Sequence, residues 1–291
     1  MLNILVTGSS SGFGYLTVLA LAKRGHTVFA TMRDPAEKNR AAAHDLRQLA
    51  GAQRLAIHVL DLDVTSDAAV QAAVDAAIAQ AGPLDVVVNN AGYLVTGLAE
   101  TATAQQVLDE LNTNVVGIQR VNRAVLPSMR ARGSGLLIHL SSIVGRTVLP
   151  FLGSYTVTKW AVEALAETYR YELKSSGVDV AIVQPGPFPT SAFDKGQPGA
   201  DAERAAGYGP LANGLELISE GIQHMFALPN APDPQEVADA IVALVDAPAG
   251  KRPARVVVDR FSGDNARTLN DAHAQVQRAV LAGIGMPFLA E

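Results

Sequence analysis

The sequence predicts an α/β fold in which a doubly wound parallel sheet of about seven strands carries helices on both faces. Short runs of Val, Ile and Leu alternate with longer Ala-rich amphipathic segments over the first two thirds of the 291 residues. The apolar runs lack the alternation of polar and apolar residues seen in strands with one solvated face, which is typical of a sheet covered on both sides. Strands that alternate with helices are joined by right-handed crossovers, so we expect the sheet to be parallel.

Each strand is expected where apolar and β-branched residues follow one another without interruption. The expected strands lie at residues 3–7, 27–31, 54–60, 84–89, 135–141, 178–184 and, more weakly, 255–259. The expected helices lie at residues 12–24, 36–50, 67–81, 104–132, 154–175 and 234–246. Thr65-Ser66-Asp67 offers N-cap residues before the third helix, and Gly82-Pro83 ends it. Gly177 follows the fifth helix, and Asp233-Pro234 begins the sixth with proline at its first position.

The composition indicates one acidic domain without thiol chemistry. The chain has 23 basic and 28 acidic residues, a net charge of −5 and no cysteine, which excludes disulfides and argues against a nucleic-acid partner. No long apolar run and no signal-like start are present, so we expect no membrane span and a cytoplasmic location. The six histidines lack ligand spacing, so no metal is expected. We expect one domain over residues 1–291, with a substrate-binding lid at 187–232 and a C-terminal extension at 260–291.

A glycine-rich turn follows the first strand and opens a helix, which is the context required of a phosphate-binding turn. It reads Thr7-Gly8-Ser9-Ser10-Ser11-Gly12-Phe13-Gly14. Glycines allow a sharp turn and a close approach of the backbone to a diphosphate, and the helix N-terminus offers unpaired N–H groups. We therefore expect Gly8, Ser10, Ser11, Gly12, Phe13 and Gly14 to contact a dinucleotide.

Further motifs follow in the order found in the short-chain dehydrogenase/reductase family. Asn89-Asn90-Ala91-Gly92 follows the fourth strand, Asn114 lies in the fourth helix, Ser142 follows the fifth strand, Tyr155-x-x-x-Lys159 lies in the fifth helix, and Pro185-Gly186 follows the sixth strand. With the glycine-rich turn, this set resembles that of the single-domain members, and the overall pattern is similar to hydroxysteroid and retinol dehydrogenases. The resemblance covers about 190 residues and implies a Rossmann-type fold and nicotinamide-dependent redox chemistry.

The end of the second strand indicates which dinucleotide is bound. Family members that use NAD place a carboxylate where this chain has Met32, and the next residue is Arg33, whose guanidinium suits a 2′-phosphate. This favours NADP(H) over NAD(H). Asp34 leaves two alternatives open, because its carboxylate could reach the ribose or pair with Arg33. The resemblance implies that Asp63 and Val64 contact the adenine, while helix capping is the alternative for the Asp63 carboxylate.

The resemblance implies that Ser142, Tyr155 and Lys159 are the catalytic group. Tyr155 and Lys159 lie one turn apart on one helix face, so a lysine ammonium near the phenol is expected to lower its pKa from about 10. Tyr155 then exchanges the proton, Ser142 positions the substrate oxygen and Lys159 holds the nicotinamide ribose. The resemblance gives Asn114 the binding of a water linked to Lys159.

The resulting prediction is an NADP(H)-dependent oxidoreductase that interconverts a carbonyl and an alcohol, with a non-catalytic NADP-binding regulator as the alternative. Asn90, Ala91, Gly92, Pro185, Gly186, Phe188 and Thr190 are expected to complete the cofactor site, although Phe188 is equally well explained as a stiff loop entrance. Apolar residues at helical spacing in the lid are more typical of packed core than of a pocket, but their position after the cofactor turn favours a lipophilic small-molecule substrate. The two long helices at 104–132 and 154–175 pack into a homodimer or homotetramer in the relatives, so we expect a homo-oligomer.

Overall fold

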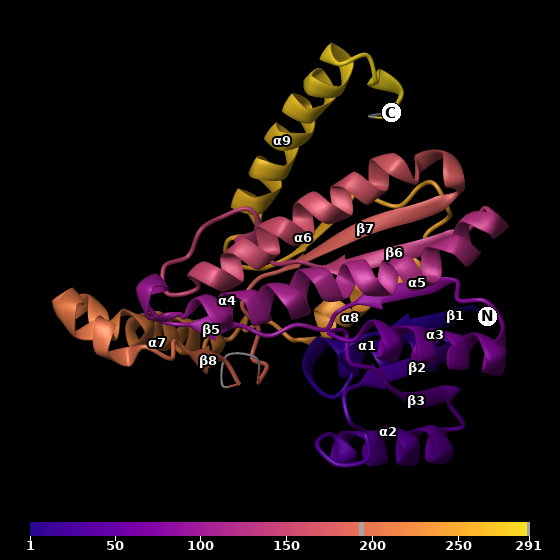
Figure 1. Ribbon diagram of the computed structural model, residues 1–291, viewed down its shortest axis with the longest axis horizontal. Helices are drawn as coiled ribbons and strands as arrows, with labels where there is room; N and C mark the ends of the chain where they lie inside the picture. Colours follow the sequence, from indigo (N-terminus) through magenta and orange to yellow (C-terminus); the bar gives the residue numbers. More distant parts are fainter. Residues whose placement is uncertain (192–194, 290–291) are drawn as a thin grey trace.

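The computed structural model describes residues 1–191 and 195–289, and all seven expected strands are present in one sheet (Figure 1). The strands are β1 (Asn3–Val6), β2 (Thr27–Met32), β3 (Ile57–Asp61), β4 (Val86–Asn89), β6 (Gly135–Leu140), β7 (Val178–Pro185) and β9 (Arg255–Val258). They are parallel throughout and run in the order β3-β2-β1-β4-β6-β7-β9. The predicted α/β fold of the Rossmann type is therefore confirmed.

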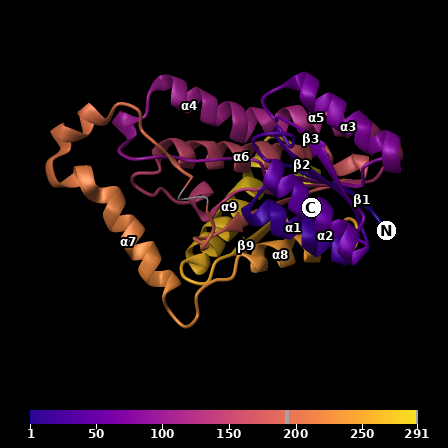
Figure 2. The same ribbon diagram turned by 90° about the horizontal axis from the view of Figure 1, so that it is seen from below.

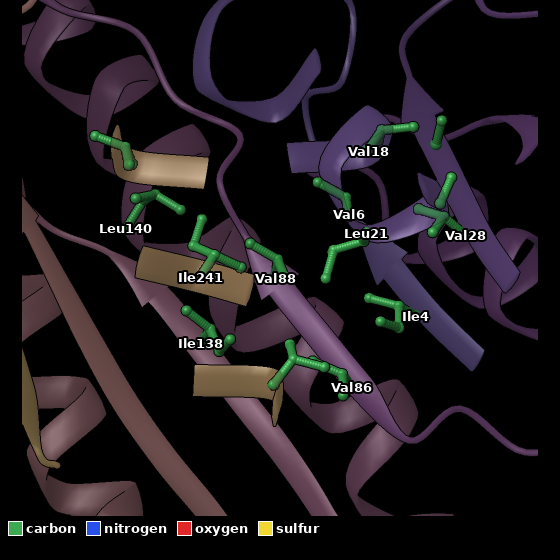
Figure 3. Packing of buried hydrophobic residues seen from close by; sticks show 14 of the residues in the cluster. Ile4, Val6, Val18, Leu21, Val28, Val86, Val88, Ile138, Leu140 and Ile241 are labelled. Atoms are coloured by element: carbon green, nitrogen blue, oxygen red, sulfur yellow. The ribbon is translucent and has the colours of Figure 1, made fainter. Parts of the chain in front are cut away.

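Helices cover both faces of the sheet. Successive strand residues point to opposite sides, and both sets are apolar, so each face has to be buried. Ile4 and Val6 pack on the side of α1 (Gly12–Lys23), α2 (Arg40–Gln53) and α8 (Gln235–Asp246), and Figure 3 shows Val18, Leu21 and Ile241 meeting the strands there. Leu5 points to the other side, which α3 (Asp67–Ala81), α5 (Gly117–Arg132) and α6 (Gly153–Glu172) cover. An apolar layer therefore lies between the sheet and the helices on each face, as the uninterrupted apolar strands predicted.

The second helix begins later than expected, at Arg40 rather than at residue 36. The preceding residues form a turn, because the Asp34 carboxylate accepts hydrogen bonds from the backbone N–H groups of Glu37 and Lys38. This helix also ends later, with Arg54 in a left-handed conformation at φ +52°. As a result, β3 begins at Ile57 and not at residue 54.

The helix expected at residues 104–132 is divided at its centre. It consists of α4 (Ala104–Leu111), a π-helical segment at Asn112–Val116, and α5. A π segment widens the helix by one residue in a turn and is common at functional sites. Asn114 lies inside this segment and is buried.

The expected lid region contains a helix over the residues with apolar helical spacing, and a short strand that was not expected. Within its described residues, β8 (Gln197–Pro198) pairs in parallel with β5 (Val95–Thr96), and a 3-10 segment at Ala202–Asn213 leads into α7 (Gly214–Phe226). Residues 192–194 of this region, including the apolar Phe193, lie outside the described residues. Both views place α7 at one end of the molecule, away from α2 and α3 (Figures 1 and 2).

The expected C-terminal extension is largely one helix, α9 (Gly263–Gly283), which projects beyond the sheet (Figure 1). Its base is fixed by polar contacts: Asn270 Nδ2 donates to Gln184 Oε1 at 2.7 Å, and His273 Nε2 lies 2.9 Å from Glu167 Oε2. Among the residues described, no helix is long and apolar enough to span a membrane.

Candidate active site

Ser142 and Tyr155 meet beyond the carboxyl end of β6. The Ser142 hydroxyl donates to the carbonyl of Pro185 at 3.3 Å and lies near the Tyr155 phenol. The neighbouring Ser141 is buried, and its hydroxyl has no hydrogen-bond partner among the described residues. Ser142, as expected from the sequence, is therefore the serine that lies toward Tyr155.

Lys159 lies beneath the Tyr155 ring. Its Nζ atom is 5.4 Å from the ring centroid and donates to the carbonyl of Leu140 at 2.8 Å. Burial lowers the pKa of Lys159 to about 8, opposed by the carboxylates of Glu110 and Glu163. Burial also raises the pKa of Tyr155 above its usual 10, and Glu110 raises it further. The expected lowering of the Tyr155 pKa is not seen for the chain's own groups, because desolvation of the phenolate and the Glu110 carboxylate both raise it.

Glu110 is the ionisable residue at this site that the sequence analysis missed. It lies in α4, is fully buried, and accepts a hydrogen bond from the backbone N–H of Val95 at 3.1 Å. Burial raises the pKa of its carboxyl group, while the Val95 backbone N–H and the Lys159 ammonium act to lower it. The available signal was its spacing, since Glu110 precedes Asn114 by four residues and so shares its helix face.

Asn114 uses its side-chain amide to hold the chain around the site. Its Oδ1 accepts from the backbone N–H of Tyr93 at 3.0 Å, and its Nδ2 donates to the Tyr93 carbonyl at 2.8 Å and to Thr158 Oγ1 at 3.1 Å. Gly92 is required here, because a Cβ atom would lie 3.0 Å from Asn114 Oδ1. The side-chain amide of Asn114 is therefore engaged by Tyr93 and Thr158, and the expected binding of a water by Asn114 stays a prediction.

The glycine-rich turn is joined to the segment after β4. Thr7 Oγ1 accepts from the backbone N–H groups of Asn90 and Ala91, both at 3.0 Å, and Asn90 Nδ2 donates to the carbonyls of Thr7 and Gly8. A Cβ atom on Gly8 would lie 2.8 Å from Ala91 Cα, and one on Gly14 would lie 2.4 Å from Asn90 Nδ2. Two of the three glycines are therefore needed for contacts within the protein.

Gly12 is the glycine that leaves room for a ligand. It has φ +57°, and a Cβ atom there would meet nothing within 4 Å. The hydroxyl of Ser11, the N-cap residue of α1, makes no capping bond, and the first N–H groups of a helix have no partner inside it. A cleft of about 390 Å³ opens at this point, lined in part by Ser10, Ser11, Gly12, Pro189, Thr190 and Ser191. These residues fit the diphosphate of a dinucleotide.

Phe13 and Phe188 lie behind this cleft and pack against each other. Their ring centroids are 5.5 Å apart at an interplanar angle of 88°, and Phe188 belongs to the buried core. The Phe188 side chain is therefore occupied by core packing, which neither the cofactor contact nor the stiff loop entrance had anticipated.

The end of β2 presents Arg33 to solvent. Met32 is buried in the core, so its side chain faces away from any ligand. Arg33 is exposed and makes no ion pair with the residues described, which removes the alternative of an Arg33–Asp34 pair. The Asp34 carboxylate instead caps the turn before α2.

The remaining expected contacts lie at the ends of β3 and β7. Asp63 Oδ1 accepts from the backbone N–H and the hydroxyl of Thr65 at 2.8 and 2.7 Å, so it closes a local turn, while Ser66 is the N-cap of α3. The Val64 side chain belongs to the second core layer. A Cβ atom on Gly186 would lie 2.4 Å from Asp259 Cγ, so glycine is required there by packing.

Comparison with known proteins connects this geometry to a family. The family model for short chain dehydrogenases matches residues 2–200. A 3-ketodihydrosphingosine reductase of Bacteroides thetaiotaomicron is 38% identical over 66% of this chain and 65% of its own length. An uncharacterized oxidoreductase of Bacillus subtilis is 35% identical over 82% of this chain and 83% of its own.

More distant relatives agree with these matches. Mouse 17-beta-hydroxysteroid dehydrogenase type 1 is 32% identical over 84% of this chain and 70% of its own length. A solved short-chain dehydrogenase from Streptomyces avermitilis superposes with a TM-score of 0.74 at 29% identity, covering 97% of this chain and 96% of that one. The chain belongs to the short-chain dehydrogenase/reductase family of oxidoreductases.

Proposed function

We propose that this enzyme is an NADP(H)-dependent oxidoreductase that interconverts a carbonyl and an alcohol on a lipophilic small molecule. The observation that carries the proposal is the placement of Ser142 near Tyr155 and of the buried Lys159 against the Tyr155 ring, in a chain that also has a cleft at Gly12. The 3-ketodihydrosphingosine reductase of Bacteroides thetaiotaomicron, a relative of this chain, is named for the reduction of a ketone.

In the proposed reaction, Tyr155 donates or accepts the proton at the substrate oxygen. Ser142 holds that oxygen by a hydrogen bond, because its hydroxyl lies against the phenol. Lys159 fixes the Tyr155 ring from below and holds the ribose next to the nicotinamide. The nicotinamide group supplies or removes the hydride. Residues at Ser10–Gly14 and the backbone after β7 bind the rest of the cofactor.

The electrostatics of the site keep the Tyr155 phenol in its protonated form. Burial and Glu110 raise the pKa of Tyr155, so the chain's own groups keep the phenol protonated near neutral pH. A protonated phenol is the form that donates to a carbonyl oxygen while the hydride arrives at its carbon.

The preference for NADP(H) rests on Arg33. Its guanidinium is exposed at the end of β2, and none of the described carboxylates pairs with it. A planar guanidinium suits a 2′-phosphate because it can donate two hydrogen bonds to it. An actinorhodin polyketide ketoreductase solved with NADPH superposes at a TM-score of 0.74 and 26% identity.

The proposed lipophilic substrate is supported by α7. Leu215, Ile218, Ile222 and Met225 share one face of this helix and are only partly buried. The Phe151 ring packs against Gly214 at the start of α7, where a Cβ atom would overlap it. This contact joins the apolar helix to the segment that leads into Tyr155.

The function is tested by following the nicotinamide absorbance while ketones, aldehydes and secondary alcohols are offered. We expect Tyr155→Phe to abolish turnover and retain cofactor binding. Tyr169→Phe is the matched control on the same helix, where the lost hydroxyl donates to Gln119 at 2.6 Å. A non-catalytic regulator would bind NADPH without turnover of any substrate, and full activity of Tyr155→Phe would reject the proton donor.

The cofactor preference is tested by titrating NADPH and NADH into the protein and into Arg33→Ala. We expect the variant to lose affinity for NADPH and to keep its affinity for NADH. Arg40→Ala at the exposed start of α2 controls for the loss of a positive charge. An unchanged ratio of the two affinities would reject Arg33 as the discriminating residue.

We also propose a homodimer or homotetramer formed through α4, α5 and α6. Leu108 of α4, Val116 of the π segment before α5, and Val157 and Trp160 of α6 are exposed large apolar residues, and exposed apolar surface of this kind marks contact sites. Light scattering should give a mass of at least twice the 30.4 kDa of one chain. A single species of 30.4 kDa would refute this association.

A further inference from the structure

Lys195 brings a positive charge to the glycine-rich turn from a distant part of the chain. Its Nζ atom donates to Ser11 Oγ at 3.2 Å, across 184 positions of sequence. The backbone N–H of Lys195 donates to the carbonyl of Ser191 at 3.0 Å, which holds the lysine beside the segment that follows β7. The side chain is exposed, and none of the carboxylates in residues 1–191 and 195–289 forms an ion pair with it.

The surroundings of this ammonium suit an anion. Ser11 is the N-cap of α1 and leaves the first turn of the helix without a side-chain cap. The positive end of the helix dipole and the N–H groups of this turn therefore point to the place that Lys195 reaches. Because the whole chain carries a net charge of −5, a polyanionic ligand needs local positive groups of this kind.

The position of the cleft identifies which phosphate is involved. Its lining includes Ser10–Gly12, which follow β1, and Pro189–Ser191, which follow β7. Arg33 follows β2 and is absent from the lining, and β2 and β7 lie on opposite sides of β1 in the sheet. Lys195 therefore approaches the turn from the side opposite Arg33. The 2′-phosphate assigned to Arg33 and the phosphate near Lys195 are separate groups.

We propose that Lys195 binds the diphosphate of the nicotinamide cofactor together with the N-terminus of α1. The inference rests on the nicotinamide-dependent function proposed above, and it adds a charged contact outside the glycine-rich turn. Since NADP(H) and NAD(H) share the diphosphate, this contact strengthens the binding of both and does not discriminate between them. It also connects cofactor binding to the segment that leads toward α7.

The test measures the affinity of Lys195→Met for NADPH, NADH, ADP and adenosine by calorimetry. Loss of one charge-assisted hydrogen bond predicts an increase in Kd of about tenfold for NADPH, NADH and ADP. Adenosine has no phosphate, so its affinity should not change. Lys195→Arg should retain most of the affinity, and Lys251→Met, an exposed lysine in the turn before β9, should bind as the unmodified protein does. Because screening weakens an exposed contact, the difference between the protein and Lys195→Met should shrink as salt is added.

Three outcomes would overturn the inference. Equal Kd values for the protein and Lys195→Met would show that the ammonium does not contact the cofactor. A loss confined to NADPH would place Lys195 at the 2′-phosphate, and an equal loss for adenosine would indicate a displaced loop in place of a lost phosphate contact. Failure of the unmodified protein to bind any dinucleotide would instead reject the proposed function, so the two failures are distinguishable.

Discussion

His139 should make the folded protein sensitive to mild acid. It lies in β6 with no exposed surface, and its Nδ1 atom is 3.4 Å from Asn89 Nδ2. Its Nε2 atom has no hydrogen-bond partner among the described residues. Burial lowers the pKa of His139 from 6.5 to about 3, so the folded protein keeps this imidazole neutral over the range in which the unfolded chain takes up a proton.

The sign and size of the effect follow from proton linkage. Between pH 6.5 and about 3 the unfolded state binds one more proton than the folded state at this position, so stability falls as the pH falls. A pH of 5 is about 1.5 units below the pKa of the histidine in the unfolded chain. This difference corresponds to a loss of about 2 kcal/mol in the free energy of unfolding. Nothing is lost from this group above pH 7.5, where both states are neutral.

The assay is urea unfolding at pH 8 and pH 5, at fixed ionic strength, for the protein and for His139→Phe. Groups common to both proteins cancel, so the loss of stability between the two pH values should be about 2 kcal/mol smaller in the variant. His44→Gln removes an exposed histidine from α2 and serves as the control. Equal losses in the protein and His139→Phe would refute the reasoning, because a neutral buried imidazole must contribute this difference.

Two other substitutions test the backbone and the site. Gly177→Ala should lower the unfolding free energy by about 3 kcal/mol, because φ is +72° and the new Cβ atom would lie 2.1 Å from the Gly133 carbonyl oxygen. Gly250→Ala is the control, because φ is +74° there and a Cβ atom would meet open space; it should lower the unfolding free energy by only about 1 kcal/mol. Equal losses for the two variants in urea unfolding would show that the clash at Gly177 has no effect. Asn114→Ala should lose about 2 kcal/mol by the same assay and lower kcat, because two Tyr93 backbone groups lose partners; unchanged stability would show that they find others.

The order of strands and helices could be predicted because it depends on local patterns. Each strand is an apolar run, and the glycine-rich turn is recognisable from neighbours in sequence. The motif residues Ser142, Tyr155 and Lys159 were brought together as expected, since the carboxyl ends of parallel strands share one edge of the sheet. Their electrostatic balance was not predictable, because it depends on burial and on Glu110, which arrives from another helix.

Charged residues on α6 show why the rest escaped prediction. Lys159, Glu163 and Glu167 recur every four residues, a spacing that indicates a solvated helix face with surface ion pairs. The structure buries Lys159 and Glu163 instead, and Arg255 from β9 lies 2.8 Å from Glu163 Oε2. Almost a hundred residues separate these partners, so no periodic pattern along the chain could reveal the pair.

The contacts of helix α9 with the rest of the fold were not predicted, for the same reason. Asn270 and His273 are polar residues in an amphipathic segment. Their side chains contact Gln184 of β7 and Glu167 of α6, which are distant in the sequence. Such contacts exist only after β7, β9 and α6 have been assembled.

The strand order has a consequence for how the chain is made. As it leaves the ribosome, β1, β2 and β3 can pair with one another early, whereas Ile4 must wait for Val86 and Ile182 for Arg255. Pairings that close long stretches of chain form slowly and leave apolar strand edges open in the meantime. Until β9 pairs with it, the outer edge of β7 therefore has unpaired backbone N–H and C=O groups to which a strand of another nascent chain can add. Pairing with β9 covers part of this edge and leaves a strand of four residues as the outer strand of the finished sheet, so less unpaired backbone is open to another chain.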